Sequence, residues 1–477
     1  MSQAVEAGAA AGAGAGVAGT ARIGVASRLL DLPLLDLAVR VAGWARDGEQ
    51  VEAYVARGRS TEVKVFEGGI ESLSSAESAG VGIRVISGSR QGFAYAGSLD
   101  DEVVAETLAE ARDNAGFGTP DEYLGLASPD GVDPPDLDLW RDELAHFPTD
   151  AKVTAALELE QMVRAGDPRI RQVESSFWGD SAGESAVATS TGITSTSRRT
   201  SCYVSAHAIA GEGADTHTGG GYSVGRAPSD LSLQIAADDA VLRATRLLGA
   251  RKPRSARLTV VLEPRITATL LAILAGTLDG EAVLKGRSLF ANRLGQSVSV
   301  PNLRLVDDPT DPDAYGASRF DAEGLACRRN VLIDGGVLQG FLYNTYAGRR
   351  VGTASTGSAV RAGFKSGPGV GARAVALQPG TASPEEILAL VGDGLLVQSI
   401  SGVHSGVNAV SGDFSVGAEG MLFRDGALAE PVRELTIAST IQRMLLDVVA
   451  IGNDLERLPS SAAGLTLAIA DVSMSGV

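Results

Sequence analysis

The chain has 477 residues, of which 44% are hydrophobic and 21% charged, and its formal net charge is −17 at pH 7. That length allows two or three domains with sizeable cores, and the composition is typical of a soluble globular protein. The negative charge and an aromatic content of 5% argue against nucleic-acid binding, which depends on Lys, Arg and stacking rings. Because no stretch is apolar over a length that could cross a bilayer, we expect a cytoplasmic protein without a nucleic-acid or membrane partner.

The N-terminus and the two cysteines fit this expectation. Residues 1–25 form an Ala/Gly tract that predicts a disordered tail, and the tract lacks the basic start and bulky apolar core of a secretory signal. Cys202 and Cys327 lie far apart, and neither has a second thiol nearby in the sequence. This spacing favours two buried, reduced thiols, with a single disulfide as the alternative.

Residues 30–250 are predicted to form an α+β domain. A helix is expected to start at Asp31, which caps it, and Pro33 suits its first turn. Two extended segments, Val51–Arg57 and Thr61–Gly69, are predicted to be strands joined by a short Gly-containing turn. A second antiparallel hairpin is expected to turn at residues 87–89.

The rest of this region alternates between helical and extended patterns. Ser98 and Asp101 resemble a capping box at the start of a helix. Further helices are predicted at about residues 150–165 and 229–248, and the Ser/Thr-rich segment 169–224 between them is strand-like. The N-terminal domain is therefore expected to combine antiparallel hairpins with flanking helices.

Residues 256–477 are predicted to form a β-rich C-terminal domain. It begins with a buried strand, Leu258–Leu262, followed by a helix that opens near Glu263-Pro264. Asp-Gly pairs at Asp334-Gly335 and Asp425-Gly426 predict tight hairpins, because this dipeptide tolerates positive φ angles. Many short strands between Gly-rich turns favour an antiparallel barrel or sandwich, with helical pieces including Pro384–Val391 and a stretch before residue 452.

Histidine positions give no short metal motif. The chain contains His146, His207, His217 and His404, and no two of them lie within one helical turn of each other. His207 and His217 flank a Gly-rich loop and could meet across a hairpin. The simpler interpretation is two polar residues beside a turn.

Two other constellations are weak. His404, Ser405 and Asp413 suggest a Ser–His–Asp triad, but adjacent side chains on an extended strand point to opposite faces, and no Gly-x-Ser-x-Gly elbow surrounds the serine. The acidic loop Asp307–Gly316 lacks the spacing of a calcium loop and is interpreted as solvated. Residues alone indicate an acidic protein of two regions without a self-sufficient catalytic set.

From about Leu37 onward, the chain resembles the TldD/PmbA family, most clearly in its C-terminal half. The strings that carry the resemblance occur in family order over roughly two hundred residues: Val260–Ser288, Phe320–Gly324, the hairpin 331–350, Ser355–Arg361, Gly406–Gly420, Glu430–Thr440 and Ile451–Glu456.

A difference from the TldD-like members indicates the branch of the family. TldD-like members carry His-Glu-x-x-x-His on the helix after the first C-terminal strand and a Cys near the C-terminus. Here Leu271, Ala272 and Gly276 occupy the corresponding positions, and no Cys follows Cys327. The chain is therefore similar to the PmbA (TldE) branch, which implies no catalytic residue and no metal ligand of its own.

The resemblance also implies a partner. PmbA-type chains are understood as non-catalytic subunits that pair with a TldD-type subunit, which holds zinc. The pair cleaves unfolded peptides or trims peptide leaders. An autonomous homodimeric metallopeptidase and a regulatory protein-binding modulator, as in the family's label as a modulator of DNA gyrase, are the alternatives.

A cleft for peptide or partner is expected near the Gly-rich segment of the C-terminal domain. The candidate residues are Arg361, Asn408, Gly412, Asp413 and Phe414. For Arg361 and Asp413 a structural ion pair is the alternative role, and for the glycines it is curvature of a barrel.

Overall fold

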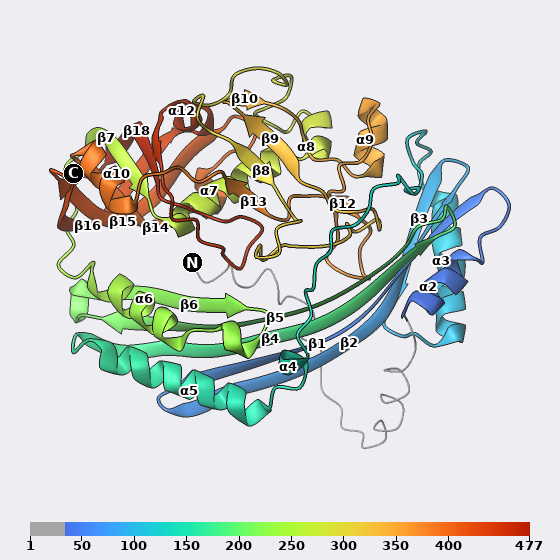
Figure 1. Ribbon diagram of the computed structural model, residues 1–477, viewed down its shortest axis with the longest axis horizontal. Helices are drawn as coiled ribbons and strands as arrows, with labels where there is room; N and C mark the ends of the chain where they lie inside the picture. The colour runs from blue at the N-terminus through green and yellow to red at the C-terminus, as the bar shows by residue number, and fades with distance from the viewer. Residues whose placement is uncertain (1–33) are drawn as a thin grey trace.

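The structure, a computed structural model, describes residues 34–477. The expected tail (1–25) and the helix start at Asp31 and Pro33 lie outside the described residues. A long curved sheet forms the first half of the chain, and the second half sits over its concave side (Figure 1).

All six strands of the curved sheet are paired antiparallel. Apolar side chains alternate with polar ones along them, so that one face of the sheet is buried under helices. In order across the sheet, the strands are β3 (Arg90–Ala96), β2 (Gly69–Ser87), β1 (Glu49–Phe66), β4 (Ile170–Thr189), β5 (Thr194–Ala210) and β6 (His217–Gly225).

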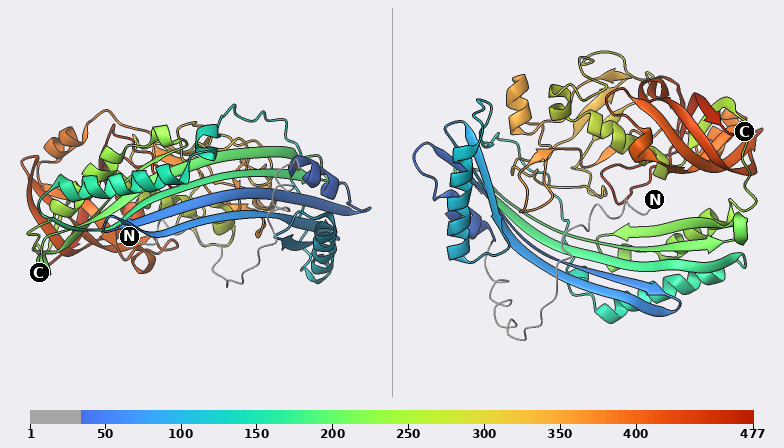
Figure 2. Two further views of the ribbon diagram at one scale, coloured as in Figure 1. Left: turned by 90° about the horizontal axis from the view of Figure 1, so that it is seen from below. Right: turned by 180° about the vertical axis from the view of Figure 1, so that it is seen from behind.

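Helices cover the convex face at both ends of the sheet (Figure 2). Gly219 and Gly221 allow one of them to approach closely, since a Cβ at Gly221 would lie 1.9 Å from the Ala236 carbonyl oxygen. The helices of this half are α2 (Leu34–Ala42) and α3 (Asp101–Phe117) at one end, α5 (Thr149–Gly166) and α6 (Leu233–Thr245) at the other, the short α4 (Asp142–Ala145), and the 3₁₀ turns η2 (Gly213–Asp215) and η3 (Pro228–Asp230).

The second half is built on a small closed barrel. Five strands form a ring, and a sixth strand joins one of them from outside. In order around the ring, the strands are β16 (Ala427–Thr440), β15 (Asp413–Arg424), β14 (Gly394–Ser401), β7 (Ala256–Leu262) and β18 (Leu467–Ser475), which pairs again with the first; β17 (Val448–Ile451) is the outer strand.

Smaller elements surround the barrel and share its core. Helix α7 (Pro264–Thr277) follows β7 directly, and its buried leucines belong to the same apolar cluster as the barrel interior. The other elements are a sheet of β10 (Val337–Leu338), β9 (Asn330–Asp334), β8 (Leu305–Asp307) and β13 (Val375–Leu377); a pair, β11 (Ala359–Val360) and β12 (Gly369–Val370); and helices α8 (Gly280–Leu284), α9 (Thr345–Val351), α10 (Pro384–Val391), α11 (Val403–Gly406) and α12 (Ile441–Leu446).

This arrangement confirms the predicted α+β class with a β-rich C-terminal barrel. Cys202 and Cys327 are both free and buried, as expected, and burial raises the pKa of each thiol to about 12. Within residues 34–477, no helix has both the length and the hydrophobicity that a membrane crossing requires.

One predicted hairpin is wrong. Val51–Arg57 and Thr61–Gly69 were expected to be two strands around a turn, but β1 runs unbroken through Gly58. Strands pair with β1 on both sides at this point, opposite Ser78 and Gly183. Gly58 serves close packing, because a Cβ there would lie 3.2 Å from the Ala182 carbonyl oxygen.

Local signals at other turns and caps were partly correct. The hairpin at Asp425-Gly426 forms as predicted, with φ angles of 49° and 78°. The other hairpin turns one residue later than expected, at Gly335-Gly336. Asp100 occupies the N-cap position of helix α3 without a side-chain capping hydrogen bond, and Ser98 donates a hydrogen bond to the Asp100 carboxylate, so the predicted Ser98–Asp101 capping box is wrong.

Candidate functional site

The three positions that are expected to correspond to the family's zinc motif lie on α7. Leu271 points into the barrel core and is 1% exposed, whereas Ala272 and Gly276 lie one turn apart on the exposed side of the helix. A Cβ built at Gly276 meets no atom within 4 Å. This side of the helix therefore has open space beside it, but it carries no side-chain atom that could bind a metal.

The residues at this place do not fit a zinc ion. Zinc requires nitrogen, sulfur or oxygen ligands, and leucine, alanine and glycine side chains supply none. Among the described residues, no group of three or more His, Cys, Asp or Glu side chains is arranged to hold a metal ion. No chemical step of this chain is therefore assigned to a metal.

The histidines of the Gly-rich hairpin do not meet. In the register of β5 and β6, His207 lies opposite Gly220, whereas His217 lies opposite Ala210. Positions 207 and 210 differ by an odd number, so the two imidazoles point to opposite faces of the sheet. The metal interpretation of this pair is wrong.

The other weak constellations have ordinary roles. Ser405 Oγ donates to the Gly402 carbonyl oxygen within the short helix α11, and Asp413 accepts a hydrogen bond from Ser411 Oγ at 2.6 Å. In the acidic loop, Asp307 accepts from the backbone N–H groups of Arg373 and Ala374, at 2.9 and 2.7 Å. That carboxylate fixes the backbone beside β13.

Arg361, a candidate cleft residue, lies in a buried charge network between the two halves. Its Nη2 donates at 2.7 Å both to Glu52 on β1 and to the Ala322 carbonyl oxygen, and the guanidinium lies 4.5 Å from the centre of the Tyr54 ring. The side chain is only 2% exposed. Arg361 therefore occupies a structural ion pair, and its guanidinium is enclosed rather than open to a peptide.

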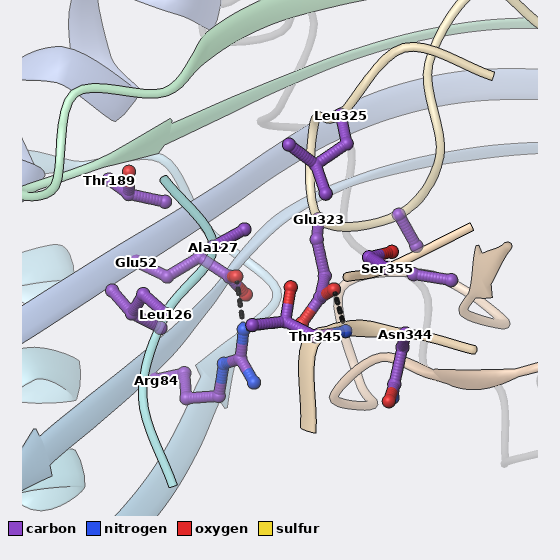
Figure 3. A network of polar contacts seen from close by, with 12 residues as sticks. Glu52, Arg84, Leu126, Ala127, Thr189, Glu323, Leu325, Asn344, Thr345 and Ser355 are labelled. Carbon is purple, nitrogen blue, oxygen red and sulfur yellow. Dashed lines mark hydrogen bonds and ion pairs between the residues drawn. The ribbon is translucent and has the colours of Figure 1, made fainter. Parts of the chain in front are cut away.

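The network continues to a second arginine (Figure 3). The other carboxylate oxygen of Glu52 accepts from Arg84 on β2 at 2.6 Å, and Arg84 lies 3.6 Å from Glu323. Glu323 in turn accepts from the Thr345 N–H at the start of α9. Burial alone would raise the pKa of Glu52, but the charges of Arg84 and Arg361 outweigh burial and lower it.

The remaining candidates surround the loop before β15. Asn408 Oδ1 accepts from the N–H groups of Val410 and Ser411 and so shapes an exposed turn, in which Asp413 is also exposed. Gly412 and Phe414 are buried, and Phe414 belongs to the barrel core. Only Asn408 and Asp413 of the five candidates therefore present a polar side chain at the surface.

A second polar cluster joins the halves at α6 and was not anticipated. Arg265, in the first turn of α7, donates to the Gly220 carbonyl oxygen at 2.9 Å and to Asp239 at 2.5 Å, and stacks 4.0 Å from the centre of the Tyr222 ring. Glu263, the residue before α7, pairs with two arginines of the α6 region. These partners are distant in sequence, so no local signal could have found them.

Comparison with known proteins identifies the family. Three domain profiles of PmbA/TldA metallopeptidases match the chain: domain 1 over residues 51–115, the central domain over 142–248 and the C-terminal domain over 255–476. The chain belongs to the PmbA/TldD family of metallopeptidases.

Individual relatives are similar over most of their length. The chain is 28% identical to the metalloprotease PmbA of Escherichia coli O157:H7, covering 91% of this chain and 94% of that protein. It is 25% identical to a metalloprotease TldD homologue of Buchnera aphidicola subsp. Schizaphis graminum, covering 79% and 80%.

Solved structures share the fold. TldE from Thermococcus kodakarensis superposes with a TM-score of 0.82 at 23% identity, covering 93% of this chain and all of that one. A Bacteroides thetaiotaomicron protein described as a proposed modulator of DNA gyrase superposes with a TM-score of 0.84 at 26% identity, covering 93% and 98%.

Proposed function

We propose that this chain is the metal-free subunit of a two-chain zinc metalloprotease that cleaves unfolded peptides or trims peptide leaders. A TldD-type subunit would hold the zinc and activate the water that attacks the peptide bond. This chain would complete the enzyme as its structural partner and as one wall of the peptide cleft. Membership of a proteolytic family supports the reaction class.

The observation that carries the proposal is the chemistry of α7. The helix keeps its position after β7 and its packing in the barrel core, yet Leu271, Ala272 and Gly276 offer no ligand and no general base. A protease that used this helix for chemistry would need His and Glu there. The helix would instead be kept for the fold and for pairing.

The concave face of the curved sheet suits a wall for an extended chain. Residues directly opposite each other share a face, and one row across β2, β1, β4 and β5 consists of Ala76, Ser60, Ser181 and Ser201. The first three are exposed and the fourth is half-buried. Small side chains allow close backbone approach without selecting a peptide sequence.

The test separates the two subunits. The chain and a TldD-type chain from the same source are purified separately and combined, zinc per chain is measured by mass spectrometry, and cleavage of an unfolded peptide is followed. We expect zinc and cleavage only where the TldD-type chain is present, full cleavage only with both chains, and loss of cleavage when the partner's zinc-binding histidines are replaced by alanine.

Two results would count against the proposal. Cleavage by this chain alone, with one bound zinc per subunit, would show an autonomous peptidase. Retrieval of DNA gyrase and no TldD-type chain in a pull-down would favour the regulatory role suggested by the description of the Bacteroides relative.

A further inference from the structure

The first part of β2 is an open strand edge. β2 pairs with β1 along its whole length, but β3 pairs only with Val81–Ser87. Within residues 34–477, residues 69–79 therefore have a strand partner on one side only, over roughly 35 Å at about 3.3 Å per residue. Unpaired N–H and C=O groups along such an edge are a template for another strand.

Other parts of the sheet's two edges are in contact with distant segments. At Gly80 a Cβ would lie 2.4 Å from both the Ala96 carbonyl oxygen and the Phe364 ring, which shows how tightly the edge is closed from this residue onward. On β6, at the opposite edge, the Gly220 carbonyl oxygen accepts from Arg265. Among the described residues, no strand pairs with residues 69–79 on the side away from β1.

Both faces of the open edge are exposed as well. All residues from Gly69 to Ser78 are exposed, including Ile70 at 53% and Leu73 at 46%. Next to them, Val63 and Val65 of β1 are fully buried on the convex side in the cluster that contains α5. A single extended peptide would pair with the backbone of this edge and leave its side chains exposed. A folded protein that contributes a strand would also shield Ile70 and Leu73 from water.

The charges of this region disfavour a second copy of the chain. Each copy carries a net charge of −17, and the open edge contains Glu71 and Glu77 but no Lys, Arg or Pro. Glu71 already pairs with Lys64 at 2.6 Å. When the edge pairs with itself about Ser74, Glu71 of each copy lies opposite Glu77 of the other, which is destabilising.

We infer that residues 69–79 of β2 are the docking edge for a strand of the zinc-bearing subunit, so that the curved sheet continues into the partner. The inference rests on the proposed function. A TldD-type relative aligns with about four fifths of this chain. A partner of this fold would offer an equivalent long strand, and antiparallel pairing would extend the sheet across the interface.

The test uses variants on the edge. Alternate residues of an antiparallel strand direct their N–H away from the existing partner, so one of Ser74 and Ser75 has an outward N–H. Ser74→Pro and Ser75→Pro are both made. The variant that keeps the wild-type melting temperature has lost the outward N–H, so it blocks pairing with a partner strand and leaves the pairing with β1 intact. Leu73→Lys tests the exposed apolar contact without changing the backbone. Ile235→Lys, on the exposed side of α6, is the matched control.

Binding to a purified TldD-type chain from the same source is measured by biolayer interferometry, and mass by sedimentation. We expect a one-to-one complex, at least tenfold weaker binding for the edge variants, and wild-type binding for Ile235→Lys. Wild-type affinity in all edge variants would overturn this inference and leave the proposed function standing. A dimer of this chain alone that Leu73→Lys dissociates would assign the edge to a second copy. If the wild type binds no TldD-type chain, both proposals fail.

Discussion

At the scale of single residues, charged side chains are buried between the two halves. Glu52 and Arg361 are 309 positions apart in sequence, and their side chains are only 1% and 2% exposed. A charge at such a depth is tolerated only with its partners, because removal of one partner leaves the other desolvated.

Replacement of Arg361 tests this dependence. Arg361→Ala is expected to lower the free energy of unfolding by about 3 kcal/mol, because Glu52 keeps only Arg84 as a charged partner. Arg424→Ala, which removes an exposed pair with Glu430, is the control and should change stability little. Urea unfolding at pH 7 measures both, and equal effects would contradict a structural role for the buried pair.

Asp321 gives the junction a pH dependence. Burial and the nearby negative charge of Glu323 raise the pKa of Asp321 to about 7, although three backbone N–H groups donate to its carboxylate. Between about pH 4 and pH 7 the folded state therefore binds more protons at this site than the unfolded state, and stability contributed by the protonated form is lost as the pH rises.

We expect Asp321→Asn to lose less stability than the wild type as the pH rises. Its amide cannot release a proton, so the free energy of unfolding should fall less between pH 4 and pH 7 than in the wild type, although the substitution costs one hydrogen bond at every pH. Urea unfolding at several pH values measures the slope. Parallel curves for the two proteins would rule out titration of Asp321 in this range.

At the scale of elements, α7 packs in the barrel core but carries no metal ligand at Leu271, Ala272 or Gly276. Its buried side is formed by Leu271 and neighbouring leucines, while Ala272 and Gly276 lie on its exposed side. Gly276 has a negative φ, and no atom lies near the position of its missing Cβ. Glycine therefore lowers the stability of the helix here, because it loses more conformational freedom on folding than alanine would.

Gly276→Ala is therefore expected to raise the free energy of unfolding by about 0.5 kcal/mol. Gly464→Ala is the opposing control, since a Cβ there would lie 1.7 Å from the Pro264 carbonyl oxygen at the start of the same helix and must displace it. Thermal unfolding compares the two, and destabilisation by Gly276→Ala would mean that this face of α7 is covered in solution.

At the scale of the whole molecule, two halves with largely separate cores are joined by polar contacts and by a small apolar cluster, in which Leu325 of the second half packs with Val187 and Ile193 of the first. The barrel and α7 share one apolar cluster, and the curved sheet has its own clusters under α2 and α3 and under α5 and α6. The Arg361 network and the Arg265 cluster join the halves. Cooperative unfolding of the whole chain therefore depends on these contacts.

The double variant Arg265→Ala, Arg361→Ala should uncouple the halves. All three tryptophans, Trp44, Trp140 and Trp178, lie in the first half, so their fluorescence reports that half while circular dichroism reports both. In urea the two signals should change together in the wild type and separately in the double variant. Coincident transitions in the variant would show that other contacts couple the halves.

The sequence by itself determined what depends on neighbouring residues. The Asp425-Gly426 hairpin and α10 at Pro384–Val391 formed as predicted, because turn and helix preferences are local. The order of the family strings likewise identified the fold, since those strings contain α7 and parts of the barrel strands β7, β15 and β16. The absence of ligands at Leu271, Ala272 and Gly276 could also be read without coordinates.

Only the tertiary structure decided what distant segments do to one another. Gly58 became part of a strand because strands flank it on both sides, and Arg361 became buried because Glu52 lies across the junction. The same holds for the Arg265 cluster and for the open edge of β2, which exists because the pairing of β2 with β3 ends at Val81. Burial and pairing are set by three-dimensional neighbours, and the sequence around a residue does not specify them.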